Sequence, residues 1–72
     1  MKKVIKLENL DCANCAAKME ERISRLPGVE KANVSFMLGK LVLYADEAAV
    51  ADILIRAEKI IHDLEPGVII HA

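Results

Sequence analysis

Two cysteines three positions apart, Cys12 and Cys15, are the residues of this chain whose types and spacing point most directly to chemistry. They lie in the segment Asp11-Cys12-Ala13-Asn14-Cys15, where strand-like alternation gives way to helical spacing. At the start of a helix both sulfurs can point at one spot, and the helix N-terminus favours their thiolate forms. Paired thiolates suit Cu(I), Zn(II) and cadmium-like ions. We therefore predict a metal site at Cys12 and Cys15. Two unrelated core cysteines are the weaker interpretation, because the pair falls in a turn and not on an apolar stripe.

Asp11, directly before the first cysteine, has two interpretations. Two sulfurs alone can hold Cu(I) in a linear arrangement, whereas Zn(II) takes about four ligands in a tetrahedron. Asp11 is the nearest candidate for a third ligand, and its hard carboxylate oxygen would favour Zn(II)-type ions over Cu(I). The same residue type is also common as a helix N-cap. The sequence leaves both roles of Asp11 open.

Other chemistry of paired cysteines is less consistent with the sequence. Covalent haem attachment needs a His after the second cysteine, and Ala16 stands there. An iron–sulfur cluster usually needs four cysteines, and this chain has two. A dithiol oxidoreductase, with Cys12 as the attacking thiolate, remains the main rival of another class. The chain is short for a thioredoxin-like fold, so we expect a binding domain and not an enzyme.

Composition limits the size and setting of the chain. With 72 residues, 54% of them apolar, the sequence predicts a single small domain over residues 1–72. A net charge of −1 argues against nucleic acid or acidic lipid as the main partner. Met1-Lys2-Lys3 is not followed by the apolar core of a signal peptide. We expect a soluble, cytoplasmic domain whose thiols stay reduced.

Hydrophobic periodicity gives the elements that would position the cysteines. Residues 4–8, 29–37, 41–45 and 68–71 read as strands, with a short turn at Gly39-Lys40. Helical stripes run from Cys12 to Leu26 and from Val50 to Leu64, and Asp46 is the expected N-cap of the second helix. Pro-Gly pairs end both helices. Met19 and Phe36 are predicted to lie on core faces.

The order strand, helix, strand, strand, helix, strand predicts an α+β domain with the ferredoxin-like βαββαβ arrangement. Two helices, each with one apolar stripe, would cover one face of a four-stranded antiparallel sheet. The loop with Asp11 to Cys15 and the Pro66-Gly67 turn should then lie at the same end of the sheet.

A run of residues around the cysteines resembles the heavy-metal-associated domain. The run Leu10-Asp11-Cys12-Ala13-Asn14-Cys15-Ala16-Ala17-Lys18 and the later Leu26-Pro27-Gly28-Val29 carry the resemblance, which covers essentially the whole chain. That family includes copper chaperones, mercury-binding proteins and cytosolic N-terminal domains of metal-exporting P-type ATPases. The resemblance implies a ferredoxin-like fold with Cys12 and Cys15 as metal ligands.

The residues beside the motif resemble the zinc, cadmium and lead branch. Copper members commonly have Met-Thr or Met-His before the first cysteine, whereas this chain has Leu10-Asp11. In the zinc, cadmium and lead ATPase domains that carboxylate is a metal ligand, and Leu10 would be an apolar anchor under the loop. Copper chaperones often carry Lys or Tyr before the last strand, whereas the turn here is Glu65-Pro66-Gly67. Glu65 could itself approach the metal, but we expect it to be a solvated turn residue.

The sequence therefore predicts a domain that binds and transfers Zn(II), Cd(II) or Pb(II) through Cys12, Cys15 and Asp11. It would be a regulatory or delivery domain of a metal-exporting P-type ATPase, and any ATP hydrolysis would lie outside these residues. A Cu(I) metallochaperone is the alternative. Expected partners are a metal-donor or metal-acceptor protein or the membrane part of a parent transporter, with no nucleic acid and no direct membrane insertion. We expect a monomer, with a metal-bridged dimer as the alternative. His62 and His71 are not expected to bind metal.

Overall fold

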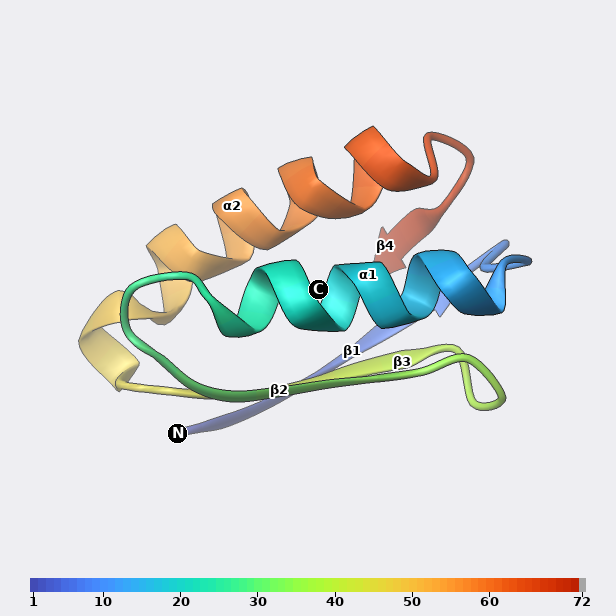
Figure 1. Ribbon diagram of the computed structural model, residues 1–72. Helices are drawn as coiled ribbons and strands as arrows, with labels where there is room; N and C mark the ends of the chain where they lie inside the picture. Colours follow the sequence, from blue (N-terminus) through green and yellow to red (C-terminus); the bar gives the residue numbers. More distant parts are fainter. Residues whose placement is uncertain (72) are drawn as a thin grey trace.

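The computed structural model describes residues 1–71. Along the chain the elements are β1 (Lys2–Glu8), α1 (Ala13–Ser24), β2 (Val29–Ser35), β3 (Lys40–Ala45), α2 (Glu47–Leu64) and β4 (Ile69–His71). The strands form one sheet in the order β2-β3-β1-β4, and all neighbouring strands are antiparallel. Both helices lie on the same side of this sheet (Figure 1). The predicted ferredoxin-like βαββαβ fold is therefore confirmed.

The core lies between the sheet and the two helices and is entirely apolar. Alternate residues of the strands point inward, among them Ile5 and Leu7 of β1 and Leu41 and Leu43 of β3. The helices contribute residues at helical spacing, which are Ala16, Met19 and Ile23 from α1 and Val50, Ile53, Ala57 and Ile61 from α2. The prediction that Met19 lies in the core is confirmed, because its side chain is fully buried. The fold therefore rests on aliphatic packing between two layers.

The hairpin between β2 and β3 differs from the prediction. We expected the second strand to reach Met37, with Phe36 on a core face, but β2 ends at Ser35. Residues 36–39 form the turn, in which Phe36 is 38% exposed. Gly39 adopts φ 61°, and its carbonyl accepts a hydrogen bond of 2.7 Å from the Leu7 N–H. The turn therefore requires a left-handed backbone at position 39. It comprises four residues, 36–39, whereas the sequence predicted the two-residue turn Gly39-Lys40.

One further prediction concerns the start of α2. Asp46 is the N-cap of α2, as predicted, and its carboxylate accepts a hydrogen bond from the Ala48 N–H. Helix α2 begins at Glu47, three residues before the first buried residue of its apolar stripe, Val50. Among residues 1–71, no helix is long and apolar enough to cross a membrane.

Candidate metal centre

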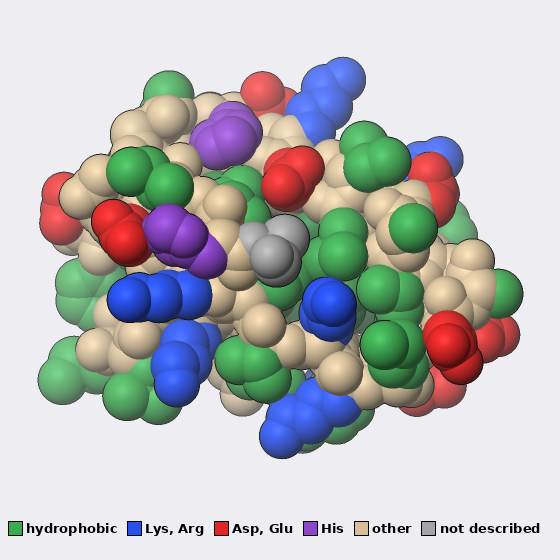
Figure 2. All heavy atoms as spheres, turned by 180° about the vertical axis from the view of Figure 1, so that it is seen from behind, with side chains coloured by type: hydrophobic (Ala, Val, Ile, Leu, Met, Phe, Trp, Pro, Cys, Tyr) green, Lys and Arg blue, Asp and Glu red, His purple; other side chains and the backbone are tan. Residues whose placement is uncertain are grey.

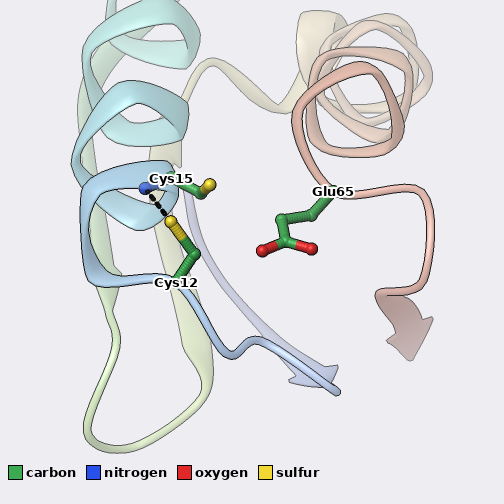
Figure 3. Close-up of side chains that lie close together, drawn as sticks. All are labelled: Cys12, Cys15 and Glu65. Carbon is green, nitrogen blue, oxygen red and sulfur yellow. Dashed lines mark hydrogen bonds between the residues drawn. The ribbon is translucent and has the colours of Figure 1, made fainter.

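The β1–α1 loop places both cysteines at the N-terminus of α1. Asn9 adopts φ 64°, which turns the chain away from β1, and Leu10 packs against the core as the predicted anchor. Cys12 is the N-cap of α1, with φ −118° and ψ 112°. Its Sγ accepts a hydrogen bond of 3.1 Å from the backbone N–H of Cys15 (Figure 3). The first cysteine thus occupies the position that Ser or Asp usually takes at a helix start.

This arrangement corrects one interpretation of Asp11. The sequence left open that Asp11 caps α1, but the capping side chain is that of Cys12, one residue later. Asp11 is exposed, and within residues 1–71 its carboxylate accepts no hydrogen bond. The role of helix cap for Asp11 is therefore wrong.

The two thiols differ in acidity because they share hydrogen bonds. The pKa of Cys12 is lowered from its ordinary value, because its sulfur accepts hydrogen bonds from the Cys15 thiol and from the Cys15 backbone N–H. The hydrogen bond to Cys12 raises the pKa of Cys15 to about 11, and partial burial and the nearby Cys12 and Glu65 charges act in the same direction. Both cysteines are half-buried free thiols. Cys12 is thus the first thiolate of the pair to form.

Glu65 enters the site from the other end of the chain. It is the C-cap residue of α2, where its N–H donates to the Ile61 carbonyl at 2.8 Å. Its own carbonyl accepts from the Val68 N–H at 3.1 Å, which closes the turn into β4. The carboxylate oxygen of Glu65 and the two cysteine Sγ atoms all lie within 4.8 Å of one another. Figure 3 shows the carboxylate pointing from the end of α2 towards the sulfurs.

Sequence reasoning considered an approach of Glu65 to the metal but did not favour it. We expected a solvated turn residue, but Glu65 is half-buried and is grouped with the cysteines. The available signal was topological, because the fold places the Pro66-Gly67 turn beside the β1–α1 loop. A hydrogen bond of 3.3 Å from Asn9 Nδ2 to the Gly67 carbonyl joins these two segments. The expectation that both loops lie at one end of the sheet is confirmed.

The two histidines have other partners. His62 Nε2 lies 3.1 Å from the Val68 carbonyl, which steadies the turn after α2. His71 Nε2 lies 2.8 Å from Glu8 Oε1. Neither histidine belongs to the group of possible ligands at the cysteines, which consists of Cys12, Cys15 and Glu65. Asp11 lies outside that group as well.

Comparison with known proteins assigns the chain to a family. The sequence model of the heavy-metal-associated domain matches residues 4–67, which is most of the chain. The chain belongs to the heavy-metal-associated domain family. Domains of this family bind heavy-metal ions, so the cysteine pair lies in a metal-binding domain.

Individual relatives of the domain are named for different metal ions. A probable cadmium-transporting ATPase of Staphylococcus aureus is 40% identical over 45 residues, which are 62% of this chain and 6% of that protein. The chain thus spans a small fraction of the length of such ATPases. The copper chaperone CopZ of Enterococcus hirae is 36% identical over 50 residues, which are 69% of this chain and 72% of that protein.

A solved structure agrees with the fold over nearly the whole domain. It is the N-terminal domain of a potential copper-translocating P-type ATPase from Bacillus subtilis in its Cu(I)-loaded state, with TM-score 0.72 and 26% identity. The match covers 97% of this chain and 82% of that one. These relatives are named for cadmium and for copper, so their names do not indicate which ion this domain binds.

Proposed function

We propose that this heavy-metal-associated domain binds a divalent soft ion, Zn(II), Cd(II) or Pb(II), and passes it to a partner by ligand exchange. The observation that carries the proposal is the Glu65 carboxylate beside the sulfurs of Cys12 and Cys15. Two thiolates and a carboxylate form a mixed donor set. Zn(II) accepts sulfur and oxygen ligands together, whereas Cu(I) is selected by soft sulfur ligands.

Charge favours the same ions. Two thiolates and the Glu65 carboxylate carry three negative charges, so a divalent ion leaves a net charge of −1 at the site, whereas Cu(I) leaves −2. An excess negative charge is costly where donors are half-buried and close together. The positive end of α1 offsets only part of it. We therefore infer that the site prefers a divalent ion.

We also propose Asp11 as a further carboxylate ligand. Its exposed side chain is adjacent to Cys12 and is not occupied as the helix cap. Cys12, Cys15 and Glu65 supply three donors, and Zn(II) takes about four. Rotation of the exposed Asp11 side chain would complete the set without a change in the fold, and its added negative charge, unlike that of half-buried Glu65, is screened by solvent.

Transfer follows from the position of the site at the edge of the domain. Both cysteines and Glu65 are half-buried, so a partner's donors can enter on the open side before the first ligands leave. We propose that the partner is a metal-donor or metal-acceptor protein, or the membrane part of a parent ATPase, in the cytoplasm. ATP hydrolysis would then lie in that parent chain, and the domain itself would catalyse no reaction.

A second candidate is a Cu(I) chaperone, and the similarity to CopZ of Enterococcus hirae favours it. In this alternative the two sulfurs alone hold Cu(I), and neither Glu65 nor Asp11 is a ligand. The two candidates therefore differ in what removal of a carboxylate does to each ion.

Competitive titration of the reduced chain with Zn(II), Cd(II) and Cu(I) tests the proposal. Glu65→Gln should weaken Zn(II) and Cd(II) by about tenfold to hundredfold and leave Cu(I) unchanged or tighter. Asp11→Asn should show the same selectivity with a smaller effect. Glu47→Gln, at the opposite end of α2, is the matched control and should change nothing.

The outcomes separate the candidates. If Glu65→Gln and Asp11→Asn leave all three ions unaffected, the divalent-ion proposal fails and the Cu(I) alternative stands. If Cys12→Ser combined with Cys15→Ser still binds metal tightly, both candidates fail.

A further inference from the structure

The face of the sheet that the helices leave uncovered is basic, although the chain as a whole is acidic. Six carboxylates and two cations lie between residues 46 and 65, on and beside α2. Four exposed lysines, in contrast, lie on the uncovered side of the strands, and these are Lys2, Lys6, Lys31 and Lys40. Glu8 shares this face and pairs with His71. Figure 2 shows Lys and Arg side chains gathered among apolar ones in the lower half of that view.

Strand register places these lysines in rows. Lys6 of β1 lies directly opposite Lys40 of β3, and Lys2 and Lys31 flank Tyr44 at the other end of the sheet. Like charges directly opposite one another destabilise a sheet. Within residues 1–71 none of the four lysines takes part in a salt bridge. Glu30, exposed in β2 next to Lys31, is the other carboxylate of the strands, so the four lysines still leave an excess of positive charge that a negative surface would neutralise.

Exposed apolar residues gather on the same side. Seven large apolar side chains are exposed in residues 1–71, and five of them lie on this face or at the tip of the adjoining hairpin: Val4, Phe36, Met37, Leu38 and Ile69. Met37 is 89% exposed and Leu38 69%. The tip is ordered by a hydrogen bond of 3.2 Å from the Leu38 N–H to Ser35 Oγ. It projects past the ends of the strands (Figure 1), directly before Lys40.

We propose that the uncovered face of the sheet docks on an anionic lipid bilayer, with the hairpin tip at residues 36–38 dipping into the acyl boundary. Lysines beside exposed apolar side chains are the pattern of interfacial membrane binding. The three successive apolar residues at the hairpin tip can insert into a fluid bilayer, which needs no preformed pocket to accommodate them. Nucleic acid would use the lysines but not this tip, and among Phe, Tyr and Trp residues the uncovered face of β1 to β4 carries Tyr44 alone. This proposal departs from our expectations of no acidic-lipid partner and no membrane insertion. The net charge of −1 gave no sign of a basic face, because the excess of carboxylates lies at α2.

Vesicle co-sedimentation of the full 72-residue chain, reduced and free of metal, tests the proposal. The vesicles are phosphatidylcholine alone or phosphatidylcholine with about one third phosphatidylglycerol. We expect binding to the anionic vesicles only, and weaker binding as salt shortens the Debye length below about 10 Å. Lys6→Gln combined with Lys40→Gln should weaken binding about tenfold or more. Lys18→Gln combined with Lys59→Gln, two exposed lysines of the helices, is the matched control and should bind as the unchanged chain does.

The role of the tip has its own variants. Met37→Ser combined with Leu38→Ser should weaken binding about tenfold or more, because the two side chains no longer enter the acyl boundary. The chain has no Trp, so Leu38→Trp is a single reporter, whose emission should shift to the blue with anionic vesicles. Equal binding to both kinds of vesicle, or no binding to either, overturns the proposal. Undiminished binding of the serine variant overturns it too, because the face is then a general polyanion site.

Discussion

Gly39→Ala should destabilise the domain strongly for its size. Gly39 has φ 61°, and a Cβ built there would lie 2.9 Å from the Leu7 carbonyl oxygen. The left-handed backbone costs a residue with a Cβ about 1–2 kcal/mol. Relieving the close contact with backbone adds a cost of about 1 kcal/mol or more, because backbone cannot move away as a side chain can. We expect a loss of about 3 kcal/mol, against a total stability of about 4–11 kcal/mol for a chain of this length.

Urea unfolding followed by circular dichroism measures this loss, and Gly67→Ala is the matched control. A Cβ at Gly67 meets nothing within 4 Å, and its φ is not positive. That substitution should be neutral or stabilise the fold by up to about 1 kcal/mol, because it restricts the unfolded chain. If Gly39→Ala unfolds at the same urea concentration as the unchanged chain, the argument from turn geometry is refuted. Equal losses from both substitutions would refute it as well.

Three further predictions concern proton release, the core and the edge of the sheet. Below a pKa of about 11 the Cys15 thiol keeps its proton, which metal binding must displace. The affinity for Zn(II) should therefore fall about tenfold or more for each unit that pH drops between about 9 and 6, and a flat profile by calorimetry would exclude Cys15 as a thiolate ligand. Ile53→Ala removes a side chain that is 1% exposed and should cost about 2–5 kcal/mol in the same urea assay, whereas a cost below about 1 kcal/mol would contradict the assigned packing. Glu20→Ala removes the carboxylate that accepts the Val34 N–H at 2.8 Å and should cost about 1 kcal/mol, with Glu20→Gln losing less, and equal losses would contradict this hydrogen bond.

The arrangement of the elements followed from the sequence because each element buries one regular face. The stripe of Val50, Ile53, Ala57 and Ile61 fixes both the helix and the side that meets the sheet. The prediction that Phe36 lies on a core face was wrong, because an apolar residue that continues the alternation of a strand can still lie in a turn. The left-handed Gly39, whose carbonyl accepts the Leu7 N–H, ends the alternation earlier than side-chain type alone indicates.

The candidate site was predictable to the extent that it is local in sequence. Cys12 and Cys15 lie three positions apart and follow from their spacing. The position of Glu65 does not follow from spacing. Its approach to the cysteines depends on where α2 ends and on the turn after it, in which the Val68 N–H donates to the Glu65 carbonyl. The cap at Cys12 was missed for another reason: sulfur is a weak acceptor, so Asp11 was the stronger candidate by residue type.

In the proposed function, the location of Glu65 separates the residues that bind the ion, Cys12 and Cys15, from the residue that determines which ion is preferred. The thiols belong to the N-cap and the first turn of α1, whereas the carboxylate lies at the end of α2, fifty residues after Cys15. A substitution at position 65 can therefore change the charge next to the sulfurs while the CxxC loop and its helix cap stay as they are. Glu65→Lys would replace an anion by a cation and reduce the net negative charge of a Cu(I) dithiolate. If Glu65 determines the preferred ion as we propose, a single substitution in this surface turn would change ion preference without a change in the segment that carries the cysteines.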